Sequence, residues 1–215
     1  PGKEEEKMMS VREHYNDWSA TYDSVENKTR DLEAIACRTI LSGSKPDSVI
    51  EIGCGTGKNT SWFATIATNV TAVDFSEQML EKAAAKVSAA NVVFRQADIS
   101  LPWRFTDREA DLISCSLVLE HIGDLQHVFN SAGDHLRKGG LFYICELHPC
   151  KQYSGSKARF ESQGALQVLQ FHVHHLSDYL SAAAAAGFRL QQLNEWFDEP
   201  RGESMPRLLS FLFSK

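Results

Sequence analysis

The sequence predicts an α/β fold with one doubly wound sheet of seven strands. The sheet is expected to be mostly parallel, with an antiparallel C-terminal hairpin strand and helices on both faces. Three observations predict this fold. Short apolar runs of strand length alternate with helical segments from about residue 46 onward, which is typical of parallel βαβ units. A glycine-rich loop directly follows the first run, and two adjacent strand-like segments close the chain.

The predicted elements follow one another in a regular order. The first helices are expected at 10–22, where apolar and aromatic side chains recur at three- and four-residue steps, and at 27–41. Strands are expected at 48–52, 69–73, 92–94, 110–116, 141–145, 188–197 and 208–213. The helices between them are expected at 59–66, at 77–88 after the capping residue Ser76, at 125–137 before a stop at 138–140, and at 178–186 after Ser177.

Composition restricts the partners and the compartment. The chain of 215 residues has 22 basic and 28 acidic residues and a net charge of −6. Because nucleic acids and anionic membranes attract proteins with a basic excess, we expect neither as a partner. No apolar stretch approaches the roughly 18 residues of a membrane helix, and no signal-peptide pattern is present. Five scattered cysteines without a C-x-x-C pair favour a reducing, cytoplasmic location.

The most informative segment is the glycine loop after strand 48–52, which contains Gly53, Gly55 and Gly57. Glycines at alternate positions allow a tight turn and a close approach of backbone to ligand. The following helix offers free N–H groups at its N-terminus. The third glycine comes one position too early for the dinucleotide fingerprint G-x-G-x-x-G, and the phosphate loop G-x-x-x-x-G-K-[ST] is absent. The pattern is instead E-x-G-x-G-x-G, beginning at Glu51.

This loop and the segments around it resemble the motifs of class I S-adenosylmethionine-dependent methyltransferases. The similarity is to the small-molecule branch, the methyltransferase-type-11 or ubiquinone-biosynthesis-like proteins, and it covers roughly residues 10–150. The resemblance implies a Rossmann-like fold, S-adenosyl-L-methionine as cofactor, S-adenosyl-L-homocysteine as product and no metal. The matching segments, in the family's order, are 15–23, 51–57, 73–80, 96–98, 111–116 and 136–141.

The resemblance also implies a set of cofactor-binding residues at the strand ends. Asp74 would accept the ribose hydroxyls and Asp98 the adenine amino group, while the Ile99 N–H would contact another adenine nitrogen. Some residues of the set have an alternative role. The two acids could be helix-capping or turn residues, Met79 could be a core residue, and Tyr22 could be an ordinary helical residue. The rest of the set is Tyr22 as a lid, Glu51 and the Ser116 carbonyl near the ammonium, Gly53 and Gly55 in the loop, and Phe75 and Met79 against adenine and ribose.

Methyl transfer requires a nucleophile aligned about 3–3.5 Å from the methyl carbon, and a hydroxyl or ammonium nucleophile must also lose a proton. We therefore expect the acceptor over the ends of strands 110–116 and 141–145. His148 is the first candidate for a general base or substrate orienter, with an exposed loop histidine as the alternative. His121 is the second candidate, and it could instead contact the cofactor or pack beside it. Glu146 is either a substrate ligand or a buried hydrogen-bonding partner.

A substrate cap is expected over residues 150–175, since long insertions are often functional. Phe160 and Phe171 could line this cap, and Trp18 could close it from the other side. The histidines at 172, 174 and 175 lack a cysteine or acid at the usual spacing of a zinc site. A polar patch facing the substrate, or plain surface or core positions, are the alternatives to a metal site.

We expect a single domain over residues 1–215. It comprises a helical lid (1–45), a cofactor-binding core (46–149), the cap (150–175) and a C-terminal helix and hairpin (176–215). The predicted function is that of an S-adenosylmethionine-dependent methyltransferase (EC 2.1.1.-) acting on an O or N atom of a small molecule. An NAD(P)-dependent oxidoreductase on a similar fold is disfavoured by the glycine spacing and the closing hairpin. A non-catalytic S-adenosylmethionine-binding protein stays open, as does the oligomeric state.

Overall fold

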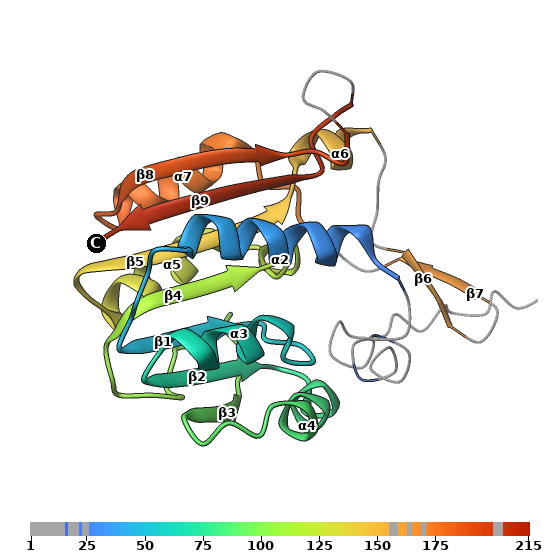
Figure 1. Ribbon diagram of the computed structural model, residues 1–215. Helices are drawn as coiled ribbons and strands as arrows, with labels where there is room; N and C mark the ends of the chain where they lie inside the picture. The colour runs from blue at the N-terminus through green and yellow to red at the C-terminus, as the bar shows by residue number, and fades with distance from the viewer. Residues whose placement is uncertain are drawn as a thin grey trace, which may run out of the picture.

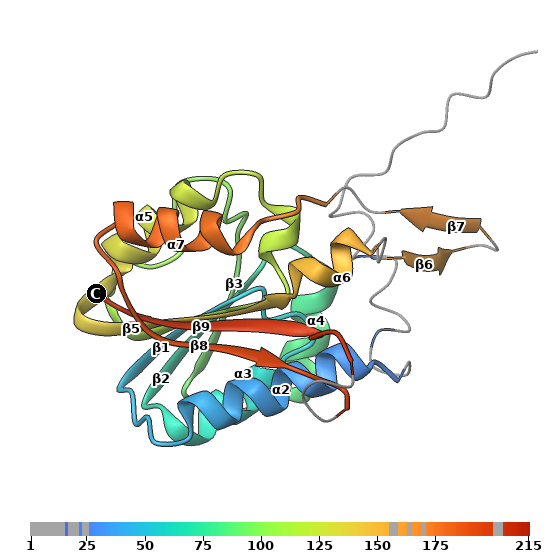
Figure 2. The same cartoon turned by 90° about the horizontal axis from the view of Figure 1, so that it is seen from above.

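The computed structural model describes residues 16, 22, 26–154, 159–162, 165–168, 171–199 and 204–215. Within these ranges a central sheet is covered by helices on both faces (Figures 1 and 2). The helix expected at 10–22 and its Trp18 lie outside the described residues, apart from Asn16 and Tyr22.

The central sheet has seven strands in the order β3-β2-β1-β4-β5-β9-β8. Strands β1 to β5 pair in parallel, and β9 is antiparallel to both β5 and β8, so the predicted fold class is confirmed. The chain reverses its direction of winding between β1 and β4, and open α/β sheets bind ligands at such a switch point. The strands are β1 (Ser48–Ile52), β2 (Asn69–Asp74), β3 (Val92–Gln96), β4 (Ala110–Ser116), β5 (Leu136–Leu147), β8 (Arg189–Trp196) and β9 (Leu208–Ser214).

The helices divide between the two faces of the sheet, as the view from above shows (Figure 2). One face carries α2 (Lys28–Leu41), α3 (Lys58–Ile66) and α4 (Glu77–Lys86), and the other carries α5 (Leu125–His135) and α7 (Leu176–Ala185). Side-chain oxygens cap three of these helices, among them α5, where Asp124 Oδ1 accepts from His127 N at 3.0 Å. The Asn27 side chain accepts from Thr29 N and Arg30 N at the start of α2, and Ser76 Oγ accepts from Met79 N at the start of α4.

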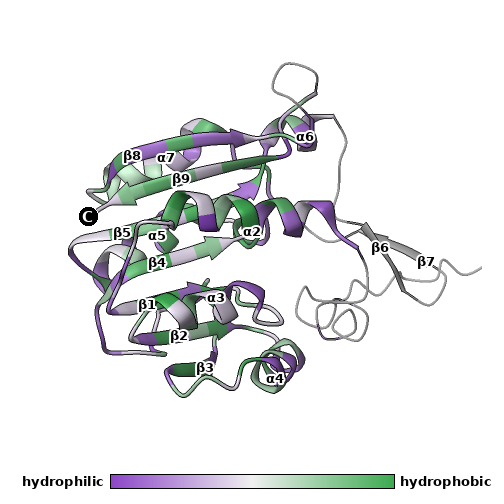
Figure 3. Cartoon of the chain, in the orientation of Figure 1, coloured by the Kyte–Doolittle hydropathy of each residue, from purple (hydrophilic) through white to green (hydrophobic). Residues whose placement is uncertain are grey.

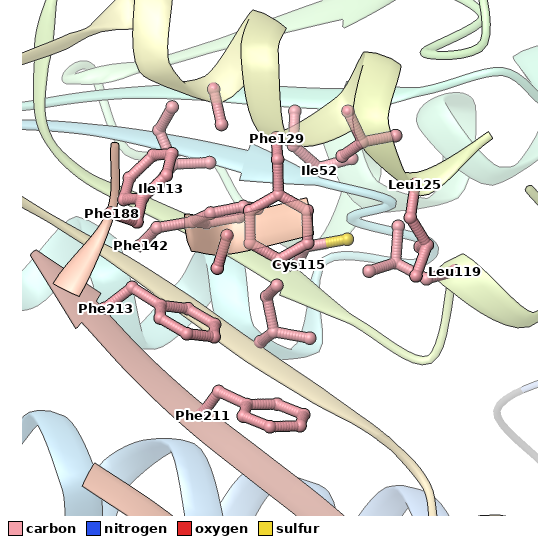
Figure 4. Packing of buried hydrophobic residues seen from close by; sticks show 14 of the residues in the cluster. Ile52, Ile113, Cys115, Leu119, Leu125, Phe129, Phe142, Phe188, Phe211 and Phe213 are labelled. Carbon is pink, nitrogen blue, oxygen red and sulfur yellow. The ribbon is translucent and has the colours of Figure 1, made fainter. Parts of the chain in front are cut away.

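Two apolar cores lie on either side of the sheet. Beneath α5 and α7, the Phe129 ring centroid lies 5.4 Å from that of Phe142 and 5.5 Å from that of Phe213, within a cluster of buried aromatic and aliphatic side chains (Figure 4). Beneath α2 and α3, Phe63 and Tyr143 anchor the second core. Hydrophobic residues follow the central strands, whereas the edge strand β8 is largely hydrophilic (Figure 3). These cores hold the strand ends rigidly beside one another.

The structure corrects three local predictions. Residues 138–140, expected to end a helix, lie inside β5, where Gly139 has φ +80° and the pairing with β4 shifts register. Helix α7 begins after His175 rather than Ser177, and Asp178 Oδ2 accepts from His175 N at 2.8 Å. The segment expected as an irregular cap contains α6 (Pro149–Tyr153) and a separate two-stranded sheet of β6 (Arg159–Ser162) and β7 (Ala165–Val168).

The two-stranded sheet lies beyond the ends to which the parallel strands point (Figures 1 and 2). Phe160 belongs to β6, whose side chains are outside the described part of the structure, and Phe171 is half-buried. Among the described residues, no helix has the length and apolar character needed to cross a membrane.

Candidate functional site

A pocket of about 310 Å³ opens at the carboxyl ends of β1, β2 and β4, at the switch point of the sheet. Its size falls in the range of small-molecule sites. The structure brings the whole predicted cofactor set, together with His121, into the lining of this one pocket. That set is Tyr22, Glu51, Gly53, Gly55, Asp74, Phe75, Met79, Asp98, Ile99 and Ser116.

The glycine loop forms the floor of the pocket in a backbone conformation that favours glycine. Gly53, Gly55 and Gly57 have φ values of +68°, +52° and +82°. A Cβ built on Gly53 would lie 2.1 Å from Val118 Cγ2, whereas one built on Gly55 would meet no atom within 4 Å. The first glycine is therefore required by the neighbouring wall, and the second leaves open space above the backbone.

Asp74 joins the end of β2 to this loop. Its carboxylate accepts from Ser76 N through Oδ1 and from Gly55 N through Oδ2, both at 2.9 Å. Burial raises the pKa of Asp74, and the backbone N–H groups oppose that shift. The turn role considered as an alternative is thus present, but each carboxylate oxygen can accept a further hydrogen bond from a ligand in the pocket.

The acid at the end of β3 and its neighbours form the opposite side of the pocket. Asp98 is exposed, and its Oδ1 accepts from Ser100 N at 2.9 Å and from Ser100 Oγ at 2.6 Å. Ile99 is buried, and its carbonyl accepts from Trp103 Nε1. Met79 is a fully buried core residue that also lines the pocket, so the core role proposed as its alternative is present as well.

Two buried carboxyl groups lie beside the glycine loop. Glu51 Oε2 accepts from Thr60 Oγ1 at 2.5 Å, and burial raises the pKa of Glu51 to about 8. Glu33, from α2, accepts through Oε2 from Asn59 Nδ2 at 2.9 Å, and burial also raises its pKa. The Ser116 hydroxyl is close enough to lower the pKa of Glu33 but does not reach hydrogen-bond geometry.

Three buried side-chain atoms in this group make no hydrogen bond to the described residues. Glu33 Oε1, Asn59 Oδ1 and Ser116 Oγ have no hydrogen-bond partner within the described ranges, and all three residues line the pocket. Buried polar atoms are rarely left unpaired, so this end of the pocket suits a polar ligand group. Glu33 and Asn59 were not predicted as site residues from the sequence. The available signal for Glu33 was a charged residue among the apolar positions of helix 27–41.

Cationic groups line the mouth of the same pocket. The Arg30 guanidinium carbon lies 4.0 Å from the centroid of the Tyr22 ring, a cation–π geometry. Lys58 Nζ contacts Asp31 Oδ1 at 2.6 Å. Asn16 Oδ1 accepts from Ser76 Oγ, the capping residue of α4, at 2.6 Å. Tyr22 lines the same pocket.

The two candidate bases have different surroundings. His121 lines the pocket, with its Nε2 atom 3.8 Å from Glu120 Oε1. His148 is not part of this lining, and it is buried rather than exposed. Its Nδ1 accepts from Cys150 N at 3.2 Å, so Nε2 carries the hydrogen and donates to Glu195 Oε1 at 3.2 Å. The structure therefore brings only the second of the two candidates to the other predicted residues.

Two other residues considered in the sequence, Glu146 and His174, form hydrogen bonds to the backbone of the protein. Glu146 is buried and accepts from backbone N–H groups, which is the buried-partner alternative. His174 Nε2 contacts the carbonyls of Leu119 and Ile122. No group of three or more histidine, cysteine or acidic residues in the described part of the chain could hold a metal ion.

The fold and the site define an α/β protein with a pocket at the switch point of its sheet, the place where open α/β sheets bind nucleotide-like ligands. Residues 50–144 match the family described as a methyltransferase domain. The chain is 26% identical to a demethylmenaquinone methyltransferase of Tropheryma whipplei over 76% of this chain and 65% of that protein. It is 23% identical to a ubiquinone biosynthesis O-methyltransferase of Xanthomonas euvesicatoria pv. vesicatoria, over 79% and 72% of the two chains.

Solved structures agree with this relationship at the level of the fold. An S-adenosylmethionine-dependent methyltransferase from Mesorhizobium loti has a TM-score of 0.72 and 20% identity, over 86% of this chain and 98% of that chain. The N-methyltransferase NodS from Bradyrhizobium japonicum, in complex with S-adenosyl-L-homocysteine, has a TM-score of 0.73 and 15% identity, over 96% and 99%. The matched family and the methyltransferases among the relatives confirm the resemblance that the motifs predicted.

Proposed function

We propose that this chain transfers a methyl group from S-adenosylmethionine to an O or N atom of a small molecule. The observation that carries the proposal is the convergence of the motif residues from four strand ends on one pocket. The names of the curated relatives, which include quinone-pathway methyltransferases, support a small-molecule acceptor. The net charge of −6 gives no basic excess for a nucleic acid. Five free cysteines support a cytoplasmic location.

The residues present fit the two ends of this cofactor. At the nucleoside end, Asp74 would hold the ribose hydroxyls and Asp98 the adenine amino group, with Phe75 against the ring. At the amino-acid end, the unpaired atoms of Glu33 and Asn59 would receive the ammonium group. When bound, the cofactor supplies an electrophilic methyl group on a sulfonium.

Further groups at this end complete the proposed site. Glu51 and Ser116 line the pocket with Glu33, and Arg30 and Lys58, which also line it, would bring positive charge near the carboxylate of the same amino-acid moiety. Tyr22 would cover this end and exclude water. The opposing charges of a zwitterion therefore find complementary groups within one part of the pocket.

His121 is the residue that we propose for orienting the acceptor or removing its proton. It lies on the pocket wall formed by the connection from β4 to α5, next to the buried Glu120, whose pKa burial raises to about 7. Imidazole titrates near neutrality, which suits a general base. For His148 to act as a base, Nε2 would have to release Glu195, so His148 is the second candidate.

Ligand-dependent melting tests the cofactor assignment. Because a ligand that binds only the folded state stabilises it by about 2.7 kcal/mol at a hundred times its Kd, we expect S-adenosylhomocysteine to raise Tm by roughly 5–10 °C for a domain of this size. NAD(H) should leave Tm unchanged. A response to NAD(H) alone would instead favour the oxidoreductase. Transfer of a labelled methyl group in a metabolite screen then separates an enzyme from a non-catalytic binding protein.

A paired substitution tests the two histidines with an acceptor from that screen. His121→Ala is expected to lower kcat roughly a hundredfold, the usual contribution of a general base. His148→Ala is expected to lower Tm through loss of its two partly buried hydrogen bonds, with a smaller change in kcat. The reverse order of effects on kcat would restore His148 as the first candidate and remove His121 from that role.

A further inference from the structure

The connection from β4 to α5 forms one wall of the pocket and has a strained backbone. It contributes Leu117, Val118 and His121 to the lining. Among the described residues, Leu117 alone combines a side chain with a positive φ, +56°, a conformation that is unfavourable for L-residues other than glycine. The wall also packs closely against the glycine loop, because Val118 Cγ2 occupies the space where a Cβ of Gly53 would lie. A shift of the wall would therefore change the shape of the loop.

Glu146 holds the start of this wall from β5. Its side chain is 2% exposed, and Oε1 accepts from Val118 N and from Leu119 N, each at 3.0 Å. The neighbouring Cys145 carbonyl accepts from Leu117 N at 2.8 Å. The strained residue is thus held by consecutive hydrogen bonds to one strand. Strained backbone persists only where the surroundings over-determine it.

His174 holds the other end of the wall, the short 3₁₀ helix η1 (Leu119–His121). Its Nε2 lies 3.1 Å from the Leu119 carbonyl and 2.7 Å from the Ile122 carbonyl, so this nitrogen carries the hydrogen. Two residues earlier, the backbone N–H of His172 donates to the Glu120 carbonyl at 2.7 Å. Residues 172 and 174 are therefore hydrogen-bonded to η1 and to the residue that follows it.

We propose that Glu146 and His174 are positioning residues that hold residues 117–122 against the glycine loop and so keep the pocket in the shape that binds the cofactor. This inference rests on the proposed function, because it takes the pocket to be the cofactor site. Glu146 accepts hydrogen bonds from backbone N–H groups at the start of the wall, and His174 donates to backbone carbonyls at its end. Neither residue needs to touch the ligand.

Isosteric and apolar substitutions test the role of Glu146. Burial raises the pKa of Glu146 to about 8, so the carboxyl is largely neutral at pH 7, and glutamine keeps the accepting oxygen. We expect Glu146→Leu to weaken S-adenosylhomocysteine binding roughly fivefold, while Glu146→Gln stays within about twofold of the unsubstituted protein. Affinity is measured by calorimetry on protein shown to be folded at the temperature used.

A matched control separates positioning from loss of stability. Asp111 is at the opposite end of β4, where Oδ2 accepts from Ser48 N at 2.8 Å and Oδ1 from Arg137 Nη1 at 2.7 Å. Asp111→Leu is expected to lower Tm without changing the affinity for S-adenosylhomocysteine. His174→Phe should weaken binding and His174→Gln, which keeps a donor, should restore it. If Glu146→Leu fails to fold, the His174 pair decides the question by the same criterion.

The outcomes are distinguishable. Unchanged affinity in both Glu146→Leu and His174→Phe overturns the proposal, as does glutamine behaving like the apolar substitutions. Failure of the unsubstituted protein to bind S-adenosylhomocysteine would overturn the proposed function itself. If the unsubstituted protein binds S-adenosylhomocysteine and the variants bind it with the same affinity, the proposed function stands and only the positioning role is removed.

Discussion

Gly53→Ala is expected to weaken S-adenosylhomocysteine binding roughly a hundredfold and to destabilise the fold by about 2–4 kcal/mol, from backbone strain and overpacking together. The residue has φ +68°, which is costly for alanine. Its new Cβ would lie 2.1 Å from Val118 Cγ2. Valine is branched at Cβ and its single side-chain torsion has few low-energy rotamers. The backbone of the loop or of the wall must therefore move to relieve the overlap. Calorimetric titration and urea unfolding measure the two effects.

Two controls separate the causes of this loss. Gly139 has φ +80°, and a Cβ there would meet no atom within 4 Å, so Gly139→Ala carries the backbone cost without the overlap and should leave binding unchanged. Adding Val118→Ala to Gly53→Ala removes the overlapping methyl group and should recover affinity beyond the sum of the single effects. Binding by Gly53→Ala as tight as that of the unsubstituted protein would show that the close packing is dispensable.

The positions of the strands and the mostly parallel character of the sheet could be predicted from the sequence, because most strands are short apolar runs with a polar or glycine-rich boundary. The bounds of β1 and β4 agree with the predicted 48–52 and 110–116. Prediction was wrong where long-range pairing outweighs local turn chemistry. The glycines at 139 and 140 indicated a stop, but β5 continues through them, with a register shift against β4 and backbone hydrogen bonds from Gly139 N to the Lys215 carbonyl and from Lys215 N to the Gly140 carbonyl. No periodic pattern marked the two-stranded sheet of β6 and β7.

The residues of the candidate site also divide into those that could be predicted from the sequence and those whose positions depend on tertiary packing. The predicted strand-end residues share a pocket because parallel strands end at one edge of the sheet. Glu33 could not be placed this way, since its position depends on how α2 packs on the sheet rather than on any strand end. His148 follows the end of β5 by one residue, and α6 begins at Pro149. The direction of its side chain is set by that turn and by Glu195, 47 residues away in sequence.

Asp74→Ala is expected to weaken S-adenosylhomocysteine binding roughly tenfold or more, equivalent to about 1.4 kcal/mol. The change removes the acceptor of two backbone hydrogen bonds, from Gly55 N and Ser76 N, and with it the proposed contact to the ribose. Asp74→Asn should be nearly as damaging, because its amide NH₂ must face one of these two N–H donors. Calorimetric titration of each variant measures the loss.

A second ligand distinguishes the two roles of Asp74. If the carboxylate contacts the ribose, the Asp74→Ala penalty should shrink for an S-adenosylhomocysteine analogue that lacks both ribose hydroxyls, since that ligand never makes the contact. If Asp74 acts only by fixing the loop through Gly55, the penalty should be equal for both ligands. An equal penalty would therefore remove the ribose assignment while leaving Asp74 as the residue that joins the end of β2 to the glycine loop.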